Sequence, residues 1–144
     1  MTIPLWALLG FAIWTVTLLL ATVGVYRWSR ILTGRVPIRE FRADRIDGED
    51  WYRRAMRAHA NCIENLPVFA AIVFVLHVSG IQSQTVDLVA CLILAARVAQ
   101  SLIHVSFVQT NTVVSLRFSF FIVQLIGFLW LATTIIFAAI ARGD

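Results

Sequence analysis

The chain has 144 residues, of which 60% are hydrophobic and only 14% are charged, and its formal net charge is +4 at pH 7. This balance is far more apolar than that of a soluble globular domain, and it indicates a single-domain polytopic membrane protein spanning residues 1–144. All 12 basic residues are arginines that cluster beside apolar segments, so membrane topology explains the basic composition better than nucleic acid, which we do not expect as a partner.

Four apolar segments are long enough to cross a bilayer. Residues 3–25 carry no charge and would form a helix about 35 Å long. The polar segment 31–50, with its glycines, proline and mixed charges, predicts a loop. The chain is therefore predicted to be an all-α bundle of four transmembrane helices. The expected spans are about 3–28, 51–78, 84–108 and 113–141.

A polar stripe runs along the start of the second span. Arg57, Asn61 and Glu64 recur at i, i+4 and i+7, which is one face of an α-helix, and Arg53 lies one turn earlier on that face. After Glu64 the chain becomes almost entirely apolar, and Pro67 should kink the helix or remove one hydrogen bond. Anchoring at the membrane interface explains the arginines, but it does not explain the amide and the carboxylate, which favour a ligand site.

The third and fourth spans also carry polar side chains. Arg97, Ser101 and His104 share one face of the third span, and an arginine as deep as Arg97 needs a partner. Arg117 lies in the first turns of the fourth span, with Gln124 two turns deeper on the same face. Cations, a carboxylate, an amide and an imidazole at similar depth suit a small zwitterionic ligand with amide groups. The sequence has no metal-binding signature, so we expect no metal.

The distribution of arginines predicts the orientation in the membrane. Six arginines lie between Arg27 and Arg45 in the first connection, whereas Arg142 is the only one on the opposite side. The positive-inside rule then places the first loop in the cytoplasm and both termini outside. In a bacterium this means an integral protein of the inner membrane with periplasmic termini.

The segment from Arg57 to Phe69, RAHANCIENLPVF, resembles the RAHxNxxExxPxF signature of the MAPEG family, the membrane-associated proteins of eicosanoid and glutathione metabolism. Ala96–Gln100 and Ser115–Arg117 supply further matches, and the resemblance covers residues 51 to about 130. It suggests a bacterial-type member. It implies a homotrimer of four-helix bundles that binds glutathione as co-substrate at the subunit interface, on the cytoplasmic side. Membrane lipids and lipophilic small molecules are the other expected partners.

The resemblance also implies roles for individual residues. Arg117 corresponds to the arginine that stabilises the glutathione thiolate and is the candidate catalytic residue. Arg97 matches a buried arginine of the third helix, and Arg27 or Arg30 matches one of the first helix. The candidate ligand-binding residues are Arg30, Arg53, Arg57, His59, Asn61, Glu64, Arg97 and His104.

The chain departs from the eicosanoid-forming members of the family. These have tyrosines near the glutathione on the third and fourth helices, whereas the only tyrosines here are Tyr26 and Tyr52. His104 stands where the third-helix tyrosine is expected, and phenylalanines follow Arg117. Eicosanoid synthesis is therefore not expected.

Three functions are compatible with these features. The leading hypothesis is a glutathione-dependent transferase or peroxidase, in which an arginine lowers the thiol pKa and the thiolate attacks a lipophilic electrophile from the bilayer. The second is a non-catalytic lipid- or small-ligand-binding membrane protein on the same fold, which the missing tyrosines favour. The third, a small drug exporter, would need a carboxylate in its first span, and residues 3–25 have none.

Overall fold

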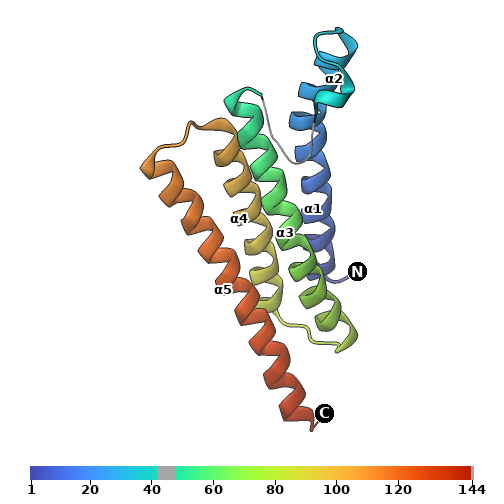
Figure 1. The fold of residues 1–144 in the computed structure, drawn as a ribbon. Helices are drawn as coiled ribbons and strands as arrows, with labels where there is room; N and C mark the ends of the chain where they lie inside the picture. The colour runs from blue at the N-terminus through green and yellow to red at the C-terminus, as the bar shows by residue number, and fades with distance from the viewer. Residues whose placement is uncertain (42–47, 144) are drawn as a thin grey trace.

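Four long helices run up and down in a bundle in the computed structural model, which describes residues 1–41 and 48–143 (Figure 1). Arg42 and Arg45, two of the six arginines counted above, lie outside the described residues. The first long helix comprises α1, a π-helical turn η1 and α2, and a short 3₁₀ turn, η2, follows it. The bounds are α1 Ile3–Leu18, η1 Leu19–Gly24, α2 Val25–Leu32, η2 Ile38–Glu40, α3 Asp50–Val78, α4 Gln84–Ser106 and α5 Asn111–Arg142.

The predicted four-helix membrane bundle is confirmed. Each of the four long helices is long and apolar enough to cross a bilayer. The first extends to Leu32, beyond the expected residue 28, because the arginines that follow the apolar segment remain helical. α4 ends at Ser106, and α5 begins earlier than expected because the side chain of Thr110 caps it by accepting a hydrogen bond from the Val113 N–H at 3.3 Å.

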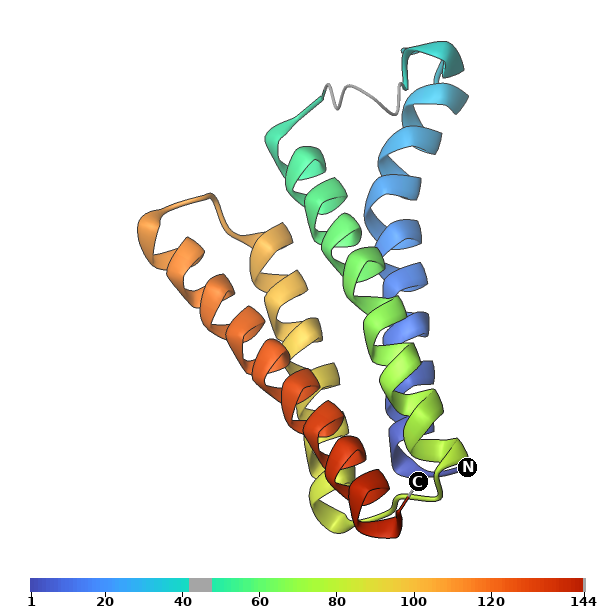
Figure 2. The same cartoon turned by 60° about the horizontal axis from the view of Figure 1, so that its bottom comes forward.

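The bundle is centred on α4, which packs against α1, α3 and α5. Three phenylalanines from different helices meet in the apolar core. The ring of Phe69 lies 5.9 Å from that of Phe11 and 5.9 Å from that of Phe128, measured between centroids. Figure 2 shows both termini at the end of the bundle opposite the first loop. The starts of α3 and α5 therefore lie at the same end as α2 (Figure 1).

The π-helical turn keeps the inward face of the first helix in register. Buried residues follow one another at helical spacing as far as Leu18, and the next two on that face are Val23 and Tyr26. The step of five from Leu18 to Val23 absorbs the extra residue of the π turn. Without it, Tyr26 would be rotated by roughly 100° away from α3. The turn therefore places Tyr26 where its ring stacks on Tyr52, with 4.1 Å between centroids.

Candidate functional site

Polar residues of α3, α4 and α5 surround a cavity of about 350 Å³, which we call the α3–α5 cavity. Four of the predicted site residues meet there. The lining residues are Asn61, Glu64, Asn65, Arg97, Gln100, Val114, Arg117, Phe118 and Phe121. Because α3 continues through Pro67 to Val78, the proline does not end the helix beneath the polar stripe.

Arg97 is a buried cation without a hydrogen-bonding partner for part of its guanidinium. Its side chain is 1% exposed and lies over the ring of Phe11, 5.5 Å from the centroid. Within residues 1–41 and 48–143, Nε and one terminal nitrogen of Arg97 have no hydrogen-bond partner. For these two nitrogens, the described part of one chain does not supply the partner expected from the sequence. Buried donors of this kind favour an oxygen-bearing ligand in the cavity.

A buried pair of glutamines fixes the start of α5 beside this cavity. The Nε2 group of Gln100 donates to the backbone carbonyl of Arg117 at 3.1 Å. Gln124, which is fully buried, donates from Nε2 to Oε1 of Gln100 at 3.0 Å and to the carbonyl of Phe120 at 2.9 Å. The pair ties α5 to α4 and so places Arg117 at the cavity. Among described atoms, Nε of Arg117 lacks a partner.

The carboxylate and the amides lie on the α3 side of the cavity. Glu64 is exposed and forms no ion pair with another described residue, so its charge is available to a ligand. Asn61 is half-buried, and its backbone carbonyl accepts a hydrogen bond from Nδ2 of Asn65 at 2.8 Å. Asn65 and Gln100 were not among the predicted site residues. Asn65 directly follows Glu64, and Gln100 lies three residues after Arg97, about one helical turn away. This proximity along the helices is the signal in the sequence that would have identified both residues.

Arg53, Arg57 and His104 line a different cavity, of about 440 Å³, which we call the arginine pocket. Arg57 lies seven residues before Glu64, about 10 Å along the helix, and therefore nearer the loop end of the bundle. The structure thus divides the predicted polar stripe between two cavities. The lining residues of the arginine pocket are Asp50, Arg53, Arg54, Arg57, His104, Val108 and Gln109.

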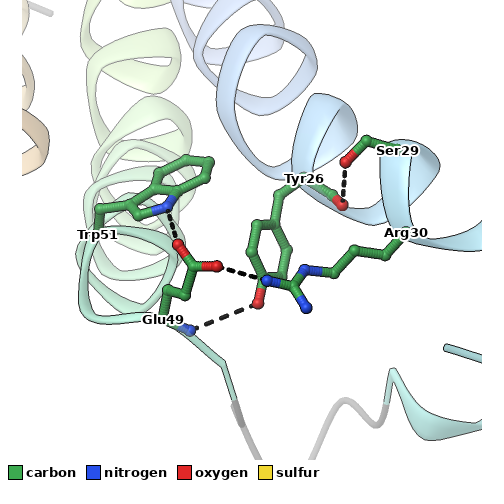
Figure 3. A network of polar contacts seen from close by, with 5 residues as sticks. All are labelled: Tyr26, Ser29, Arg30, Glu49 and Trp51. Atoms are coloured by element: carbon green, nitrogen blue, oxygen red, sulfur yellow. Dashed lines mark hydrogen bonds and ion pairs between the residues drawn. The ribbon is translucent and has the colours of Figure 1, made fainter. Parts of the chain in front are cut away.

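Arg30 belongs to a separate network at the end of α2 (Figure 3). Its guanidinium lies over the ring of Tyr26, 4.4 Å from the centroid, and forms an ion pair with Glu49. The other carboxylate oxygen of Glu49 accepts a hydrogen bond from Nε1 of Trp51 at 2.8 Å. Within one chain, therefore, neither Arg30 nor the half-buried His59 lines the α3–α5 cavity or the arginine pocket.

Comparison with protein-family models matches residues 3–137 to the MAPEG family. Comparisons with curated proteins and with solved structures give no match.

Proposed function

The chain belongs to the MAPEG family, and from this premise we propose that it is a glutathione-dependent transferase or peroxidase acting on lipophilic electrophiles. Family membership and four spanning helices make it an integral multi-pass membrane protein. The observation that carries the proposal is the α3–α5 cavity, where two arginines with unpaired nitrogens, a carboxylate and an amide come together.

The charges of the cavity complement those of glutathione. Glutathione has two carboxylates, one ammonium group and two peptide amides. Arg97 offers unpaired donors to an anionic or carbonyl oxygen, Glu64 offers a carboxylate to the ammonium, and Asn61 offers an amide to a peptide group. A volume of about 350 Å³ lies at the lower end of the range for small-molecule sites, so part of the ligand would extend beyond one chain.

We propose that a second copy of the chain packs against this site and shields it from lipid. Glu64 is exposed on a spanning helix, where lipid cannot satisfy a charged group. Association of copies would bury such groups against protein, and the family resemblance implies a homotrimer. The proposed cytoplasmic placement of the site follows from the arginine-rich first connection.

Arg117 is the proposed catalytic residue. A cation next to the glutathione sulfur favours the charged form and so lowers the thiol pKa. In the transferase reaction the thiolate donates its electron pair to an electrophilic carbon, a carbon–sulfur bond forms, and the leaving group departs with its bonding electrons. Phe118 and Phe121 line the cavity beside Arg117 and give an apolar wall for a substrate that enters from the bilayer.

The same wall favours a second candidate function. Neither phenylalanine has a hydroxyl that could hydrogen-bond the sulfur, so the cavity resembles a binding site as much as a catalytic one. A non-catalytic protein that binds lipids or small ligands on this fold would keep the binding residues and would not ionise the thiol.

Thiolate formation separates the two functions. The ultraviolet absorbance of glutathione bound to the wild type should rise at a lower pH than that of free glutathione. Arg117→Ala should move this titration to higher pH while leaving the affinity within a few-fold, because the cation that favours the thiolate is gone. Arg39→Ala, at an exposed position in η2, is the matched control. Identical titrations for wild type and Arg117→Ala would remove the proposed mechanism.

A further inference from the structure

We propose that a groove between α4 and α5 binds one acyl chain of a membrane phospholipid. The groove has a volume of about 360 Å³, and we call it the α4–α5 groove. It is separate from the α3–α5 cavity and from the arginine pocket, because it shares no lining residue with either of them. The proposal does not depend on the glutathione reaction.

The close approach of the two helices at Gly127 forms the floor of the groove. Gly127 is buried, and a Cβ added there would lie 2.8 Å from Cγ1 of Ile93 and 3.5 Å from Cγ1 of Val89, both on α4. Val89 and Val123 are half-buried and also line the groove. Because glycine has no side chain, the surface between the two helices is hollow at this point.

The rim of the groove is exposed and mainly apolar. Leu92, Ile126 and Trp130 are 52%, 61% and 37% exposed. None of the lining residues is charged, and Thr85 supplies the only hydroxyl. The α3–α5 cavity and the arginine pocket, in contrast, are both lined by arginines. An uncharged hollow of this kind suits a hydrocarbon chain and has no group that would bind a charged ligand.

The groove lies at the depth of the hydrocarbon region. α4 and α5 are both long and apolar enough to span a bilayer, and they lie side by side (Figure 1, Figure 2). Thr85 is the second residue of α4 and Leu92 lies seven residues further on, so the groove extends about 10 Å along the helix. This is roughly a third of the hydrocarbon thickness. A phospholipid of the leaflet nearest the termini would lay part of one acyl chain in the groove, with its ester groups near Thr85.

The place of the groove on α5 favours a lipid over a second copy of the chain. Val123 lines the groove and follows Phe121, which lines the α3–α5 cavity, by two residues. This step corresponds to about 200° around the helix, so the groove and the cavity lie on opposite sides of α5. A copy that shields Glu64 approaches from the cavity side and leaves the groove facing lipid. An empty hollow would forfeit the dispersion contacts that a flexible acyl chain provides.

Lipid binding to the full chain in a non-ionic detergent, followed by native mass spectrometry, tests the proposal. The probe is dioleoylphosphatidylcholine. The wild type should retain one lipid per chain in a saturable manner. Val123→Phe, which places a ring in the groove, should weaken binding by roughly tenfold or more, because the ring and the acyl chain compete for the same space.

A second pair of variants guards against misfolding of Val123→Phe. Leu92→Ala removes part of the exposed rim and should weaken binding severalfold, because the acyl chain loses dispersion contacts. Leu102→Ala is the matched control, because Leu102 lies on the same helix, is 50% exposed and does not line the groove. It should bind the lipid like the wild type.

Three results would overturn the proposal. The first is a wild type that retains no lipid, or that binds it as tightly as Val123→Phe and Leu92→Ala do. The second is tighter binding of dioleoylphosphatidylglycerol that Val123→Phe does not weaken, since the arginines would then hold the lipid by its headgroup. The third is a Val123→Phe variant that loses its association with other copies, since a second copy would then cover the groove. Similar affinities for both lipids, each lowered by Val123→Phe, support the groove as the site, whether or not glutathione binds.

Discussion

Replacing Gln124 by leucine tests whether the buried glutamine pair holds α5 against α4. Gln124 is fully buried, and its Nε2 group donates to Oε1 of Gln100 at 3.0 Å and to the carbonyl of Phe120 at 2.9 Å. Gln100 in turn donates to the backbone carbonyl of Arg117 at 3.1 Å. Leucine has a similar volume but no donor, so the buried Oε1 of Gln100 would lose the partner that Gln124 provides.

We expect Gln124→Leu to lower the free energy of unfolding by about 1–3 kcal/mol, the range for a buried polar group left unpaired. The interhelical hydrogen bond itself contributes less, about 0.6 kcal/mol on average within membranes and about 1.7 at most. The double variant Gln100→Leu/Gln124→Leu removes both amides. It should therefore be destabilised by less than the sum of the single variants, with a coupling energy of about 0.6–1.7 kcal/mol.

Unfolding in mixed micelles of increasing dodecyl sulfate content, followed by circular dichroism, measures these changes. Thr134→Val is the control, because the hydroxyl of Thr134 donates within its own helix, to the carbonyl of Trp130 at 2.9 Å. It should change stability by less than Gln124→Leu does. A Gln124→Leu variant as stable as the wild type, or strictly additive single variants, would refute the role given to the pair.

Three further predictions concern orientation, assembly and packing. A reporter fused to the C-terminus should be active only outside the cytoplasm, and activity inside would reverse the proposed topology. The mass of the protein in detergent should correspond to three copies, because the exposed charge of Glu64 needs protein around it, and monomers alone would contradict this. Gly127→Ala should destabilise the protein by about 1–3 kcal/mol in the same unfolding assay, because the added Cβ would lie 2.8 Å from Cγ1 of the buried Ile93. Gly24→Ala is the control and should not destabilise the protein in this way, because its Cβ would meet a backbone carbonyl oxygen at 3.4 Å.

The four helices could be predicted because apolar length and charge determine where a chain crosses a membrane. The π turn in the first span could not. Residues 3–25 carry no charge, and the threonines among them include the buried Thr15 and the exposed Thr17, so the sequence does not mark which face is inward. The step from Leu18 to Val23 becomes visible only once burial is known.

The composition of the site was predicted in part. Helical spacing brought Asn61 and Glu64 to one face, and both line the α3–α5 cavity. The same spacing placed Arg57 with them, whereas the neighbouring helices divide the stripe and leave Arg57 in the arginine pocket. Spacing along one helix cannot reveal such a division, because it depends on where α4 and α5 cross α3.

Contacts between distant segments were beyond the reach of the sequence. Arg30 was considered for the ligand site, yet in one chain it pairs with Glu49, which is 19 residues away and lies across the first loop. The bond between Gln100 and Gln124 likewise joins two helices whose relative register no local pattern specifies.

Calorimetric titration with glutathione, of the wild type beside Glu64→Gln, tests most directly whether the α3–α5 cavity holds this ligand. Glutamine keeps the size of the side chain and removes the charge proposed to bind the ammonium group. The wild type should bind in a saturable manner, and Glu64→Gln should lose about 1.5–3 kcal/mol, or roughly 10- to 150-fold in affinity. A wild type that releases no heat of binding, or two proteins with the same affinity, would contradict the proposed site.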